Sequence, residues 1–551
     1  MTPTLLTPRP AATLILAREG AAGPEVFLMQ RTLKANFVAG AYVFPGGAVD
    51  PGDADAFWAD NAEGFDDRRA SRLLGMEQGG LAYWIAAVRE CFEESGLLLA
   101  RDGAGQVPGA EELTALRARL AAGELDFNTL CRERGLRPTL AALGYFSHWI
   151  TPPGMSRRFD TRFFLAAAPA EQIAVPDLVE TIDHAWLRPE DALAMNKRGE
   201  LELVFATVQT LRALSGFDSV AAMLAHAHAL DAVPALMPRI STGSRGRRMV
   251  LPEDRAYAEV GKLDPFGEGQ AWSEIVPGRV VRLSERVRRL TAPNPGFMTG
   301  PGTNSYLVGD GDALALIDPG PEDAQHIEAL LRESGAQLRY ILATHTHMDH
   351  SPAARRLKEL TGAEVLGMPA PPHARQDQGF APDRVLRHGE RIAVGNATLR
   401  VVHTPGHASN HLCYLLEEEK MLFTGDHVMQ GSTVVINPPD GNMQAYFDAL
   451  RALLEEDLEW LAPGHGFLID QPHRAVRRLL AHRQAREDKV LQALRGAGGA
   501  TLEMLLPLVY NDVPPERHAM ALRSLLAHLE KLAAEGRAGH GDGDGVWRAA
   551  A

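Results

Sequence analysis

The feature that most constrains the fold is the heptapeptide Thr-His-Thr-His-Met-Asp-His at residues 344–350. This one short stretch holds four candidate metal ligands, which are His345, His347, Asp349 and His350. In an extended stretch alternate side chains share a face, so the first two are expected to reach one ion while the last two turn toward a neighbouring one. The heptapeptide therefore predicts a pair of metal sites, and zinc is the natural occupant of a histidine and carboxylate ligand set.

The flanking residues predict that the heptapeptide lies on a loop between a strand and a helix. Residues 340–343 are a short apolar run, as in a buried strand. Behind the heptapeptide, Ser351 and Pro352 are residue types favoured at a helix N-cap and at the first helical position.

Three further candidate ligands follow, and each comes shortly after an apolar run that predicts a strand. They are His407 after residues 399–402, Asp426 after 421–423 and His465 after 458–462. Small residues beside them allow the backbone to approach a metal closely.

The order of these residues resembles that of the metallo-β-lactamase-fold hydrolases, over roughly residues 277–485. The resemblance implies an αββα sandwich and two zinc ions, with metal-activated water attacking a carbonyl or phosphorus centre and Asp349 among the catalytic residues. The implied ligands are His345, His347 and His407 for one zinc, Asp349, His350 and His465 for the other, and Asp426 as a bridge. His403, His411 and His427 have no matching position and are expected to support the ligands or lie at the surface. Segments 302–307 and 316–320 are expected to be architectural.

The first half carries a second pattern, in which three acidic residues share a helix face. Residues 81–94 predict a helix whose apolar side is Ile85, Val88 and Phe92. Positions i, i+3 and i+4 are neighbours on a helix, and here they are Glu90, Glu93 and Glu94. Crowded carboxylates repel unless cations lie among them, and Mg²⁺ or Mn²⁺ prefers such oxygen ligands.

This helix, with the Phe-Pro-Gly-Gly turn at 44–47 before it, resembles the Nudix box. In the common pattern seven residues separate the first acidic position from the Arg-Glu pair, whereas residues 54–88, 35 in all, separate Asp53 from Arg89 here. Such an interrupted box resembles the coenzyme A diphosphatase branch of Nudix hydrolases. The resemblance implies metal-assisted cleavage of a CoA or nucleoside diphosphate derivative, with Glu93 and Glu94 as main ligands and Glu90 as ligand or base.

Two arginines further along are candidates for binding substrate. Arg157 and Arg158 could clamp a phosphate bidentately, or they could belong to a solvated strand edge.

The end of the chain is predicted to be a winged helix. Residues 473–494 predict a long helix with five arginines, and two helices and a hairpin ending at Trp547 follow. Such a tail follows the zinc domain in the β-lactamase-like protein 2 group, which includes a single-strand endoribonuclease, so single-stranded RNA enters as a candidate partner. Charge argues against it, because residues 500–551 hold five Lys and Arg against seven Asp and Glu.

Length and composition predict a multi-domain α/β enzyme. A chain of 551 residues is expected to form three or four domains at ~150 residues each. Residues 238–269 show no convincing period and mark a join, so the expected domains are 1–270 (Nudix-like), 271–485 (metallo-β-lactamase-like) and 486–551 (winged-helix-like). No apolar run is long enough to span a membrane, and three scattered cysteines predict a cytoplasmic protein without disulfides.

Two functional hypotheses follow. The first is a bifunctional hydrolase, in which a Nudix diphosphatase is fused to a two-zinc hydrolase of a phosphodiester or ester, with a homodimer as a candidate assembly. The second is a nucleic-acid or metabolite binding protein in which one or both sites have lost turnover and kept recognition. Within the enzyme hypothesis, the alternative is a glyoxalase II-like zinc thioesterase whose Nudix unit binds a metabolite without turnover. A net charge of −14 argues against generic nucleic-acid binding by the whole surface.

Overall fold

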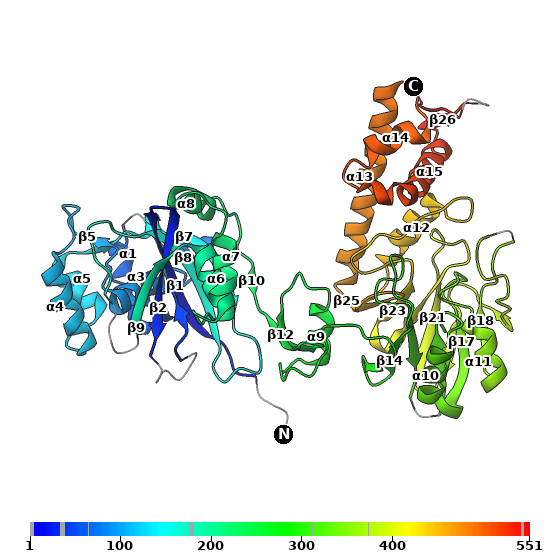
Figure 1. Ribbon diagram of the computed structural model, residues 1–551, viewed down its shortest axis with the longest axis horizontal. Helices are drawn as coiled ribbons and strands as arrows, with labels where there is room; N and C mark the ends of the chain where they lie inside the picture. The colour runs from blue at the N-terminus through cyan, green and yellow to red at the C-terminus, as the bar shows by residue number, and fades with distance from the viewer. Residues whose placement is uncertain are drawn as a thin grey trace. The chain divides into compact units, whose positions relative to one another are not determined.

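The chain divides into two compact units (Figure 1), each of which is described by itself. The computed structural model describes residues 5–32, 39–63, 65–175, 181–310, 312–372, 374–541 and 545–550. One unit holds Met1–Ile240 and Phe266–Glu268, and the other holds Ser241–Pro265 and Gly269–Ala551. The domain limits near 270 and 485 stay predictions.

The first unit is built on an eight-stranded mixed sheet of order β10-β7-β8-β1-β2-β3, in which β4 also pairs with β1 and β9 with β2. Its long central strand β1 is parallel to β8 and antiparallel to β2 and β4. The strands are β1 (Arg9–Gly20), β2 (Gly23–Arg31), β3 (Tyr42–Val43), β4 (Gly46–Ala48), β7 (Gly144–Ile150), β8 (Phe159–Ala167), β9 (Thr181–Leu187) and β10 (Ala235–Leu236). A separate pair is β5 (Ala100–Arg101) with β6 (Arg137–Pro138).

Helix α3 (Leu81–Ser95) packs on this sheet, close to the predicted bounds 81–94. Its predicted apolar face is buried, and Gly96 ends it in the left-handed conformation, which glycine adopts without a steric penalty. The stretch 54–88 contains the short helices α1 (Trp58–Asn61) and α2 (Asp67–Leu73) and the first two turns of α3 itself. The remaining helices are η1 (Pro51–Ala54), α4 (Ala110–Ala121), α5 (Phe127–Arg134), η2 (Leu140–Ala142), α6 (Pro189–Arg198), α7 (Phe205–Leu214) and α8 (Val220–His228).

The second unit is a sandwich of two sheets, with a buried apolar core between them. The first sheet has seven strands in chain order, which are β13 (Val281–Arg282), β14 (Val287–Thr291), β15 (Asn304–Val308), β16 (Leu314–Ile317), β17 (Leu338–Leu342), β18 (Glu364–Gly367) and β19 (Arg384–Val385). The second has six, which are β20 (Arg391–Val394), β21 (Ala397–His403), β22 (Leu412–Leu416), β23 (Met421–Gly425), β24 (Trp460–Pro463) and β25 (Ile469–Asp470).

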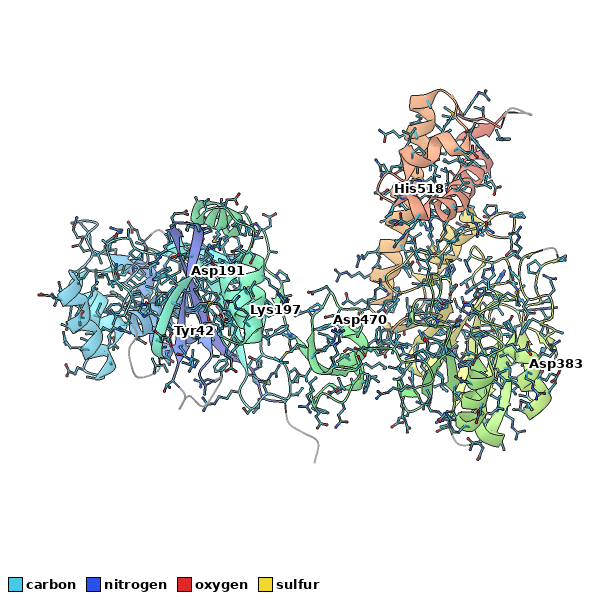
Figure 2. All side chains as sticks on the ribbon, viewed as in Figure 1. Tyr42, Asp191, Lys197, Asp383, Asp470 and His518 are labelled. Carbon is cyan, nitrogen blue, oxygen red and sulfur yellow. The ribbon has the colours of Figure 1, made fainter. Side chains whose placement is uncertain are left out.

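Helices cover both outer faces of the sandwich, as Figure 1 shows. The first sheet packs against α10 (Ala324–Ser334) and α11 (Ala353–Thr361), and the second against α12 (Met443–Leu453) and the start of α13 (Pro472–Ala497). At the outer edge of the first sheet, Asp383 pairs with Lys358 of α11 (Figure 2). Short 3-10 turns lie at η3 (Gly335–Gln337) and η4 (Glu417–Glu419).

Residues 238–269, which show no sequence period, contain regular structure. They form the hairpin β11 (Arg239–Gly243) and β12 (Gly246–Val250), followed by α9 (Tyr257–Leu263). Buried Glu259 of α9 pairs with Arg289 of β14 at 2.7 Å and accepts from the Leu468 N–H at 2.9 Å. Residues 241–265 of this segment therefore pack as part of the second unit.

The C-terminal part has the predicted helix, helix and hairpin order. It contains α13, α14 (Leu502–Val509), η5 (Pro515–Arg517), α15 (His518–Ala534), β26 (Ala538–His540) and β27 (Trp547–Ala549). Residues 542–544 of the predicted hairpin lie outside the described residues. Within the described ranges, no helix combines the length and the apolar character needed to cross a membrane.

Candidate metal centres

The first candidate centre brings three imidazoles together from two strand ends. His345 and His347 follow β17, and His407 follows β21. The Nε2 atoms of His345 and His407 lie 2.9 Å and 3.0 Å from Nδ1 of His347. One nitrogen from each ring lies within 4.8 Å of the others, so these residues could hold one ion.

In His345 and His407 the outer nitrogen, Nδ1, is already hydrogen bonded, and this determines whether the inner nitrogen, Nε2, carries a proton or a lone pair. The Thr344 hydroxyl donates to Asp318 Oδ2 at 2.9 Å, so it accepts from Nδ1 of His345 at 3.0 Å. His407 donates through Nδ1 to the Val435 carbonyl oxygen at 2.8 Å. A neutral imidazole has a single N–H. Both Nε2 atoms therefore direct a lone pair toward the centre of the group.

The second candidate centre is built from Asp349, His350 and His465, whose ligand atoms also lie within 4.8 Å of one another. The Nε2 atoms of His350 and His465 lie 3.4 Å and 3.3 Å from Asp349 Oδ2. His350 donates through Nδ1 to Asp318 Oδ2 at 2.9 Å, and His465 donates through Nδ1 to the Gly302 carbonyl at 3.2 Å. These bonds hold the Nδ1 protons on the outer side, so each ring would direct an Nε2 lone pair inward once a metal displaces the Nε2 proton.

Asp426, just after β23, faces both groups. Its Oδ1 lies 3.5 Å from Nε2 of His350 and 3.3 Å from Nε2 of His465. Its Oδ2 lies 3.7 Å from Nε2 of His407. A third set of close ligand atoms comprises His345, His350 and Asp426. The seven predicted ligands are thus brought to one edge of the sandwich, with one carboxylate between two sets of three.

The pKa values of His345 and His347 favour neutral rings in the first group. Burial holds the pKa of His345 well below its usual range, and the neighbouring imidazoles of His350 and His347 lower it further. Burial and His407 lower the pKa of His347 to about 4. Neutral imidazole is the form that binds a metal, so this group is ready for a cation near neutral pH.

The carboxylates of the second group are ionised and draw positive charge toward them. Burial opposes ionisation of Asp349, but His350 outweighs it, and the pKa of Asp349 stays well below its usual range. Burial also opposes charge on His465, but Asp426 and Asp349 raise its pKa to about 9. A proton at Nε2 of His465 therefore takes the place that a dication would occupy.

Two further observations indicate that the residues fit a metal pair. Among the described residues, Nε2 of His350 and Oδ1 of Asp426 are buried without a hydrogen-bond partner, which is costly unless an ion satisfies them. A Cβ at Gly464 would lie 2.8 Å from Cε1 of His350 and 2.9 Å from Oδ1 of Asp426. Only glycine leaves both ligands their space.

In the first unit, Arg89 joins the interrupted box. Its Nε and Nη2 donate to Oδ1 and Oδ2 of Asp53 at 2.8 Å and 2.9 Å, although the insertion separates the two residues. Its Nη1 donates to Glu90 at 2.9 Å and to Glu93 at 3.1 Å, and its Nη2 also reaches the Ala48 carbonyl. Arg89 thus holds β4, the η1 turn and α3 in one arrangement.

The three glutamates of α3 lie beside the glycine turn. Glu94 is buried and accepts from the Gly46 N–H at 2.8 Å. A Cβ at Gly47 would lie 2.5 Å from Oε1 of Glu90, so that glycine makes room for the carboxylate. Burial raises the pKa of Glu90 to about 7 against the influence of Arg89, and burial also raises the pKa of Glu93. A divalent cation among these groups would relieve that cost.

Known protein families match the chain in three consecutive stretches. The NUDT19 Nudix domain family matches residues 8–213, the Metallo-beta-lactamase superfamily residues 298–465, and the Beta-lactamase associated winged helix domain residues 501–547. Lactamase-like protein aptB of Emericella nidulans is 31% identical over 52% of this chain and 95% of its own length. Lactamase-like protein nscB of Arthroderma benhamiae is 33% identical over 54% of this chain and 71% of its own length.

The chain belongs to the metallo-β-lactamase superfamily. It carries a Nudix domain ahead of that domain and a winged helix behind it, and both enzyme families are hydrolases that generally bind metals.

Two solved structures align with separate parts of the chain. A NUDIX hydrolase from Alicyclobacillus acidocaldarius is 32% identical, covers 40% of this chain and 96% of its own, and has a TM-score of 0.35. A Beta-lactamase domain protein from Burkholderia ambifaria is 22% identical, covers 50% of this chain and 95% of its own, and has a TM-score of 0.44.

One residue of the metallo-β-lactamase domain, Asp318, was expected from the sequence to be only architectural but supports the candidate ligands. Asp318 follows β16 with a φ of +53° and is buried. It accepts from the N–H of Thr344 at 2.7 Å, from the Thr344 hydroxyl and from His350. Asp318 thereby orients His350 directly and His345 through Thr344. The signal for this role was an acidic residue at a position whose left-handed backbone conformation is unfavourable for residues other than glycine.

The three further histidines that the sequence singled out, His403, His411 and His427, lie outside the ligand groups. His411 and His427 are fully buried, and His403 is half-buried with its ring facing the Ser409 carbonyl. The expected N-cap role of Ser351 is not seen, because α11 begins one residue later and the Ser351 hydroxyl donates to Asp377.

In the Nudix domain, the two predicted phosphate-binding arginines differ. Arg157 is exposed. The guanidinium of Arg158 is buried and already donates to the carbonyls of Thr151 and Leu6 at 3.0 Å and 2.6 Å. Their substrate role stays a prediction, and it suits Arg157 better. Arg162, four residues after Arg158 and within β8, is buried over the Tyr83 ring of α3 at 4.3 Å.

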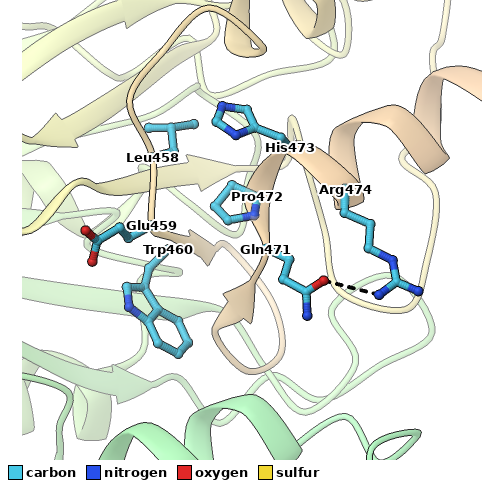
Figure 3. Close-up of a pocket in the computed structure, with 7 residues that line it drawn as sticks. All are labelled: Leu458, Glu459, Trp460, Gln471, Pro472, His473 and Arg474. Atoms are coloured by element: carbon cyan, nitrogen blue, oxygen red, sulfur yellow. Dashed lines mark hydrogen bonds between the residues drawn. The ribbon is translucent and has the colours of Figure 1, made fainter. Parts of the chain in front are cut away.

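Figure 3 shows a cavity of about 490 Å³ at the N-terminus of α13. It is lined by Leu458, Glu459, Trp460, Gln471, Pro472, His473 and Arg474. None of the predicted site residues lines it, and Trp460 lies at the end of β24 away from His465.

Proposed function

We propose that the chain is a bifunctional metal-dependent hydrolase. Its Nudix domain would cleave the diphosphate linkage of a CoA or nucleoside diphosphate derivative with Mg²⁺ or Mn²⁺. Its metallo-β-lactamase domain would use two zinc ions to hydrolyse a phosphodiester or ester. The observation that carries the proposal is the placement of Asp426, whose two oxygens face two separate sets of inward-pointing imidazole nitrogens.

In the metallo-β-lactamase domain, the proposed ligands are His345, His347 and His407 for one zinc, Asp349, His350 and His465 for the other, and Asp426 for both. When bound, zinc ions supply a water activated near neutral pH and an electrophile for the scissile group. Asp349 is a quarter exposed and is the carboxylate of the set best placed to take a proton from solvent-side water. Thr303 donates to Asp349 Oδ2 at 3.3 Å and so fixes its orientation.

In the Nudix domain, Glu93 and Glu94 are the proposed main ligands and Glu90 is a ligand or base. Support comes from the Arg89–Asp53 pair, because the interrupted box keeps the contacts of a folded centre. Glu93 is one-third exposed, so it lies on the side of the cluster that substrate can reach.

An ester or thioester is favoured over RNA in the metallo-β-lactamase domain by the apolar residues around the centre. Met348, between the ligands, is 60% exposed, and Phe297 and Met298 are 65% and 53% exposed. Phe297 and Met298 lie on the loop that ends at Gly302, and the Gly302 carbonyl accepts a hydrogen bond from Nδ1 of His465. Exposed apolar residues at a site suit an apolar acyl group better than a polyanion. A glyoxalase II-like thioesterase is therefore the second candidate, and RNA binding and a homodimer stay predictions.

The test is product analysis with two single variants of the full chain. Acyl-CoA thioesters, CoA, nucleotide sugars and short single-stranded RNA are offered to wild type, Asp349→Ala and Glu93→Ala. We expect Asp349→Ala to abolish ester or phosphodiester hydrolysis and to leave diphosphate cleavage unchanged, and we expect the reverse for Glu93→Ala.

His403→Ala and Glu111→Ala serve as controls, since each removes a polar side chain of the same domain outside the candidate centre. Product patterns that neither Asp349→Ala nor Glu93→Ala alters would contradict the bifunctional reading. If Asp349→Ala abolishes a reaction and Glu93→Ala abolishes none, the chain is a thioesterase or esterase whose Nudix domain only binds its ligand.

A further inference from the structure

The proposed ligand His407 depends on a loop that carries no ligand. Residues 427–442, between β23 and α12, are called here the 427–442 loop. The Val435 carbonyl in this loop accepts the Nδ1 proton of His407 at 2.8 Å. That bond selects the tautomer whose Nε2 lone pair points into the centre. The position of the Val435 carbonyl therefore sets the position of a ligand.

The neighbouring carbonyl is held from the C-terminal part of the chain. Arg483, in the middle of α13, donates through Nη2 to the Val434 carbonyl oxygen. Arg483 is 3% exposed, and among the described residues no carboxylate lies within ion-pair distance of it. A buried guanidinium without a counter-charge is costly. Such a cost is tolerated where the group has a specific task.

A second contact reinforces the first. The guanidinium of Arg483 lies 5.5 Å from the centre of the Tyr446 ring, and the Tyr446 hydroxyl donates to the His427 carbonyl at 2.8 Å. The 427–442 loop is thus held at its first residue by α12 and near its middle by α13. Both anchors meet at Arg483.

The next arginine of the same helix has a different environment. Arg486, three residues further along α13, pairs with Asp512 at 2.7 Å and donates to the Val509 carbonyl. It is 8% exposed, so it is nearly as buried as Arg483, but its partners lie in the winged helix. Arg486 is therefore a matched control for burial, charge and helix position.

We propose that Arg483 is a positioning residue for the metal centre. By fixing the Val434–Val435 peptide it holds the carbonyl that orients His407, and it makes the first helix of the C-terminal part a component of that centre. The inference rests on the proposed function for the zinc ligands. It extends that function by giving the helix that leads into the winged helix a role in metal binding.

The experiment uses the full-length chain, stripped of metal and titrated with Zn²⁺ and, in parallel, with Co²⁺, whose visible absorption reports coordination geometry. Arg483→Met removes the donors and keeps the apolar stem. We expect the apparent dissociation constant of one of two ions to rise by about 10- to 100-fold, as for other residues that orient ligands. The Co²⁺ spectrum should change, and kcat should fall with KM nearly constant.

Three variants complete the test. Arg483→Lys restores one donor and should recover most of the metal affinity. Arg483→Gln, which is too short to reach the Val434 carbonyl, should behave like Arg483→Met and replaces it if that protein fails to fold. Arg486→Met should lower thermal stability and leave the metal affinity and the Co²⁺ spectrum as in wild type.

Wild-type metal affinity and spectrum in both Arg483→Met and Arg483→Gln would overturn the inference, as would an equal loss of affinity in Arg486→Met. These readouts need no substrate. A wild-type chain that binds two ions yet hydrolyses nothing would contradict the proposed function and leave the role of Arg483 standing.

Discussion

Asp318 is not itself a proposed ligand, but its hydrogen bonds orient two of the proposed ligands, His350 directly and His345 through Thr344. Its carboxylate accepts from Thr344 and His350, and both bonds need an acceptor. Asp318→Asn would place an amide NH₂ where one of these donors points. We expect zinc affinity to fall by about 10- to 100-fold, because ligand-orienting carboxylates contribute at that level. Competition with a coloured chelator measures it.

Asp323→Asn is the control for this change, since Asp323 caps α10 close by in the chain through the His326 N–H and makes no contact with a proposed ligand. Unchanged zinc affinity in Asp318→Asn would show that the imidazoles keep their orientation without it.

A substitution at Gly47 should affect turnover by the Nudix domain without affecting its thermal stability. A Cβ at this position would lie 2.5 Å from the carboxylate of Glu90, which is the end of a flexible side chain. Gly47→Ala is therefore expected to displace Glu90 and to lower Mg²⁺-dependent turnover at least tenfold, while the melting temperature changes little. Steady-state kinetics and thermal unfolding check the two parts.

Gly103→Ala is the matched control, because a Cβ at Gly103 would meet no atom within 4 Å. If Gly47→Ala keeps full turnover, the position of Glu90 is not critical for the reaction.

The sequence pointed to the candidate ligands but not to the residues that orient them, and the reason can be seen at single residues. His345, Asp349 and His465 are recognisable because their types and spacing are local properties of the chain. The role of Asp318 depends on a left-handed turn and on a hydrogen-bond chain through Thr344, which arise only when β16 and β17 pair in register. Such support is a property of the folded arrangement.

At the scale of elements, α13 shows the same limit. Its position and approximate length are predictable from its period, but the five arginines within residues 473–494 do not form one solvated face. Arg483 and Arg486 are buried, whereas Arg474, Arg477 and Arg478 are exposed. The sequence cannot separate the two sets, because burial here comes from packing against the 427–442 loop and the winged helix.

The helix α13 also carries a buried charge that links stability to pH. Glu487 faces His528, Lys531 and Arg537. Burial opposes its ionisation, but the bonds to His528 and Lys531 lower its pKa from 4.5 to about 2. The stabilisation is therefore complete above the unfolded-state pKa and is lost as pH falls toward the folded-state value. At neutral pH it amounts to roughly 3 kcal/mol.

Glu487→Gln should remove this pH dependence. We expect the variant to be less stable than wild type at pH 7 and the difference to shrink by about half or more between pH 5 and pH 3. Urea unfolding at each pH measures the difference, and hydrogen exchange in peptides of α13 and α15 assigns it to this part. A difference that stays constant over that range would contradict the ionised state of Glu487.

At the scale of the whole molecule, the order of the three domains was predictable and the join between the first two was less so. Residues 238–269 have no period because a short hairpin and a two-turn helix leave little regular pattern. Their assignment to the second unit depends on the buried pair of Glu259 with Arg289, thirty positions apart in the chain. Pairing over that separation is invisible to local composition.

The two candidate centres belong to different compact units and present different ligand chemistry, so their metals should be separable in one sample. Nitrogen-rich ligands hold zinc in the presence of Mg²⁺, whereas three carboxylates favour Mg²⁺ or Mn²⁺. A chelator selective for transition metals should abolish ester or phosphodiester hydrolysis and leave Mg²⁺-dependent diphosphate cleavage. After complete removal of metal, Zn²⁺ should restore only the first reaction and Mg²⁺ only the second. Restoration of both reactions by one ion would mean that the two centres do not differ in metal preference, and the assignment of ions to the centres would have to change.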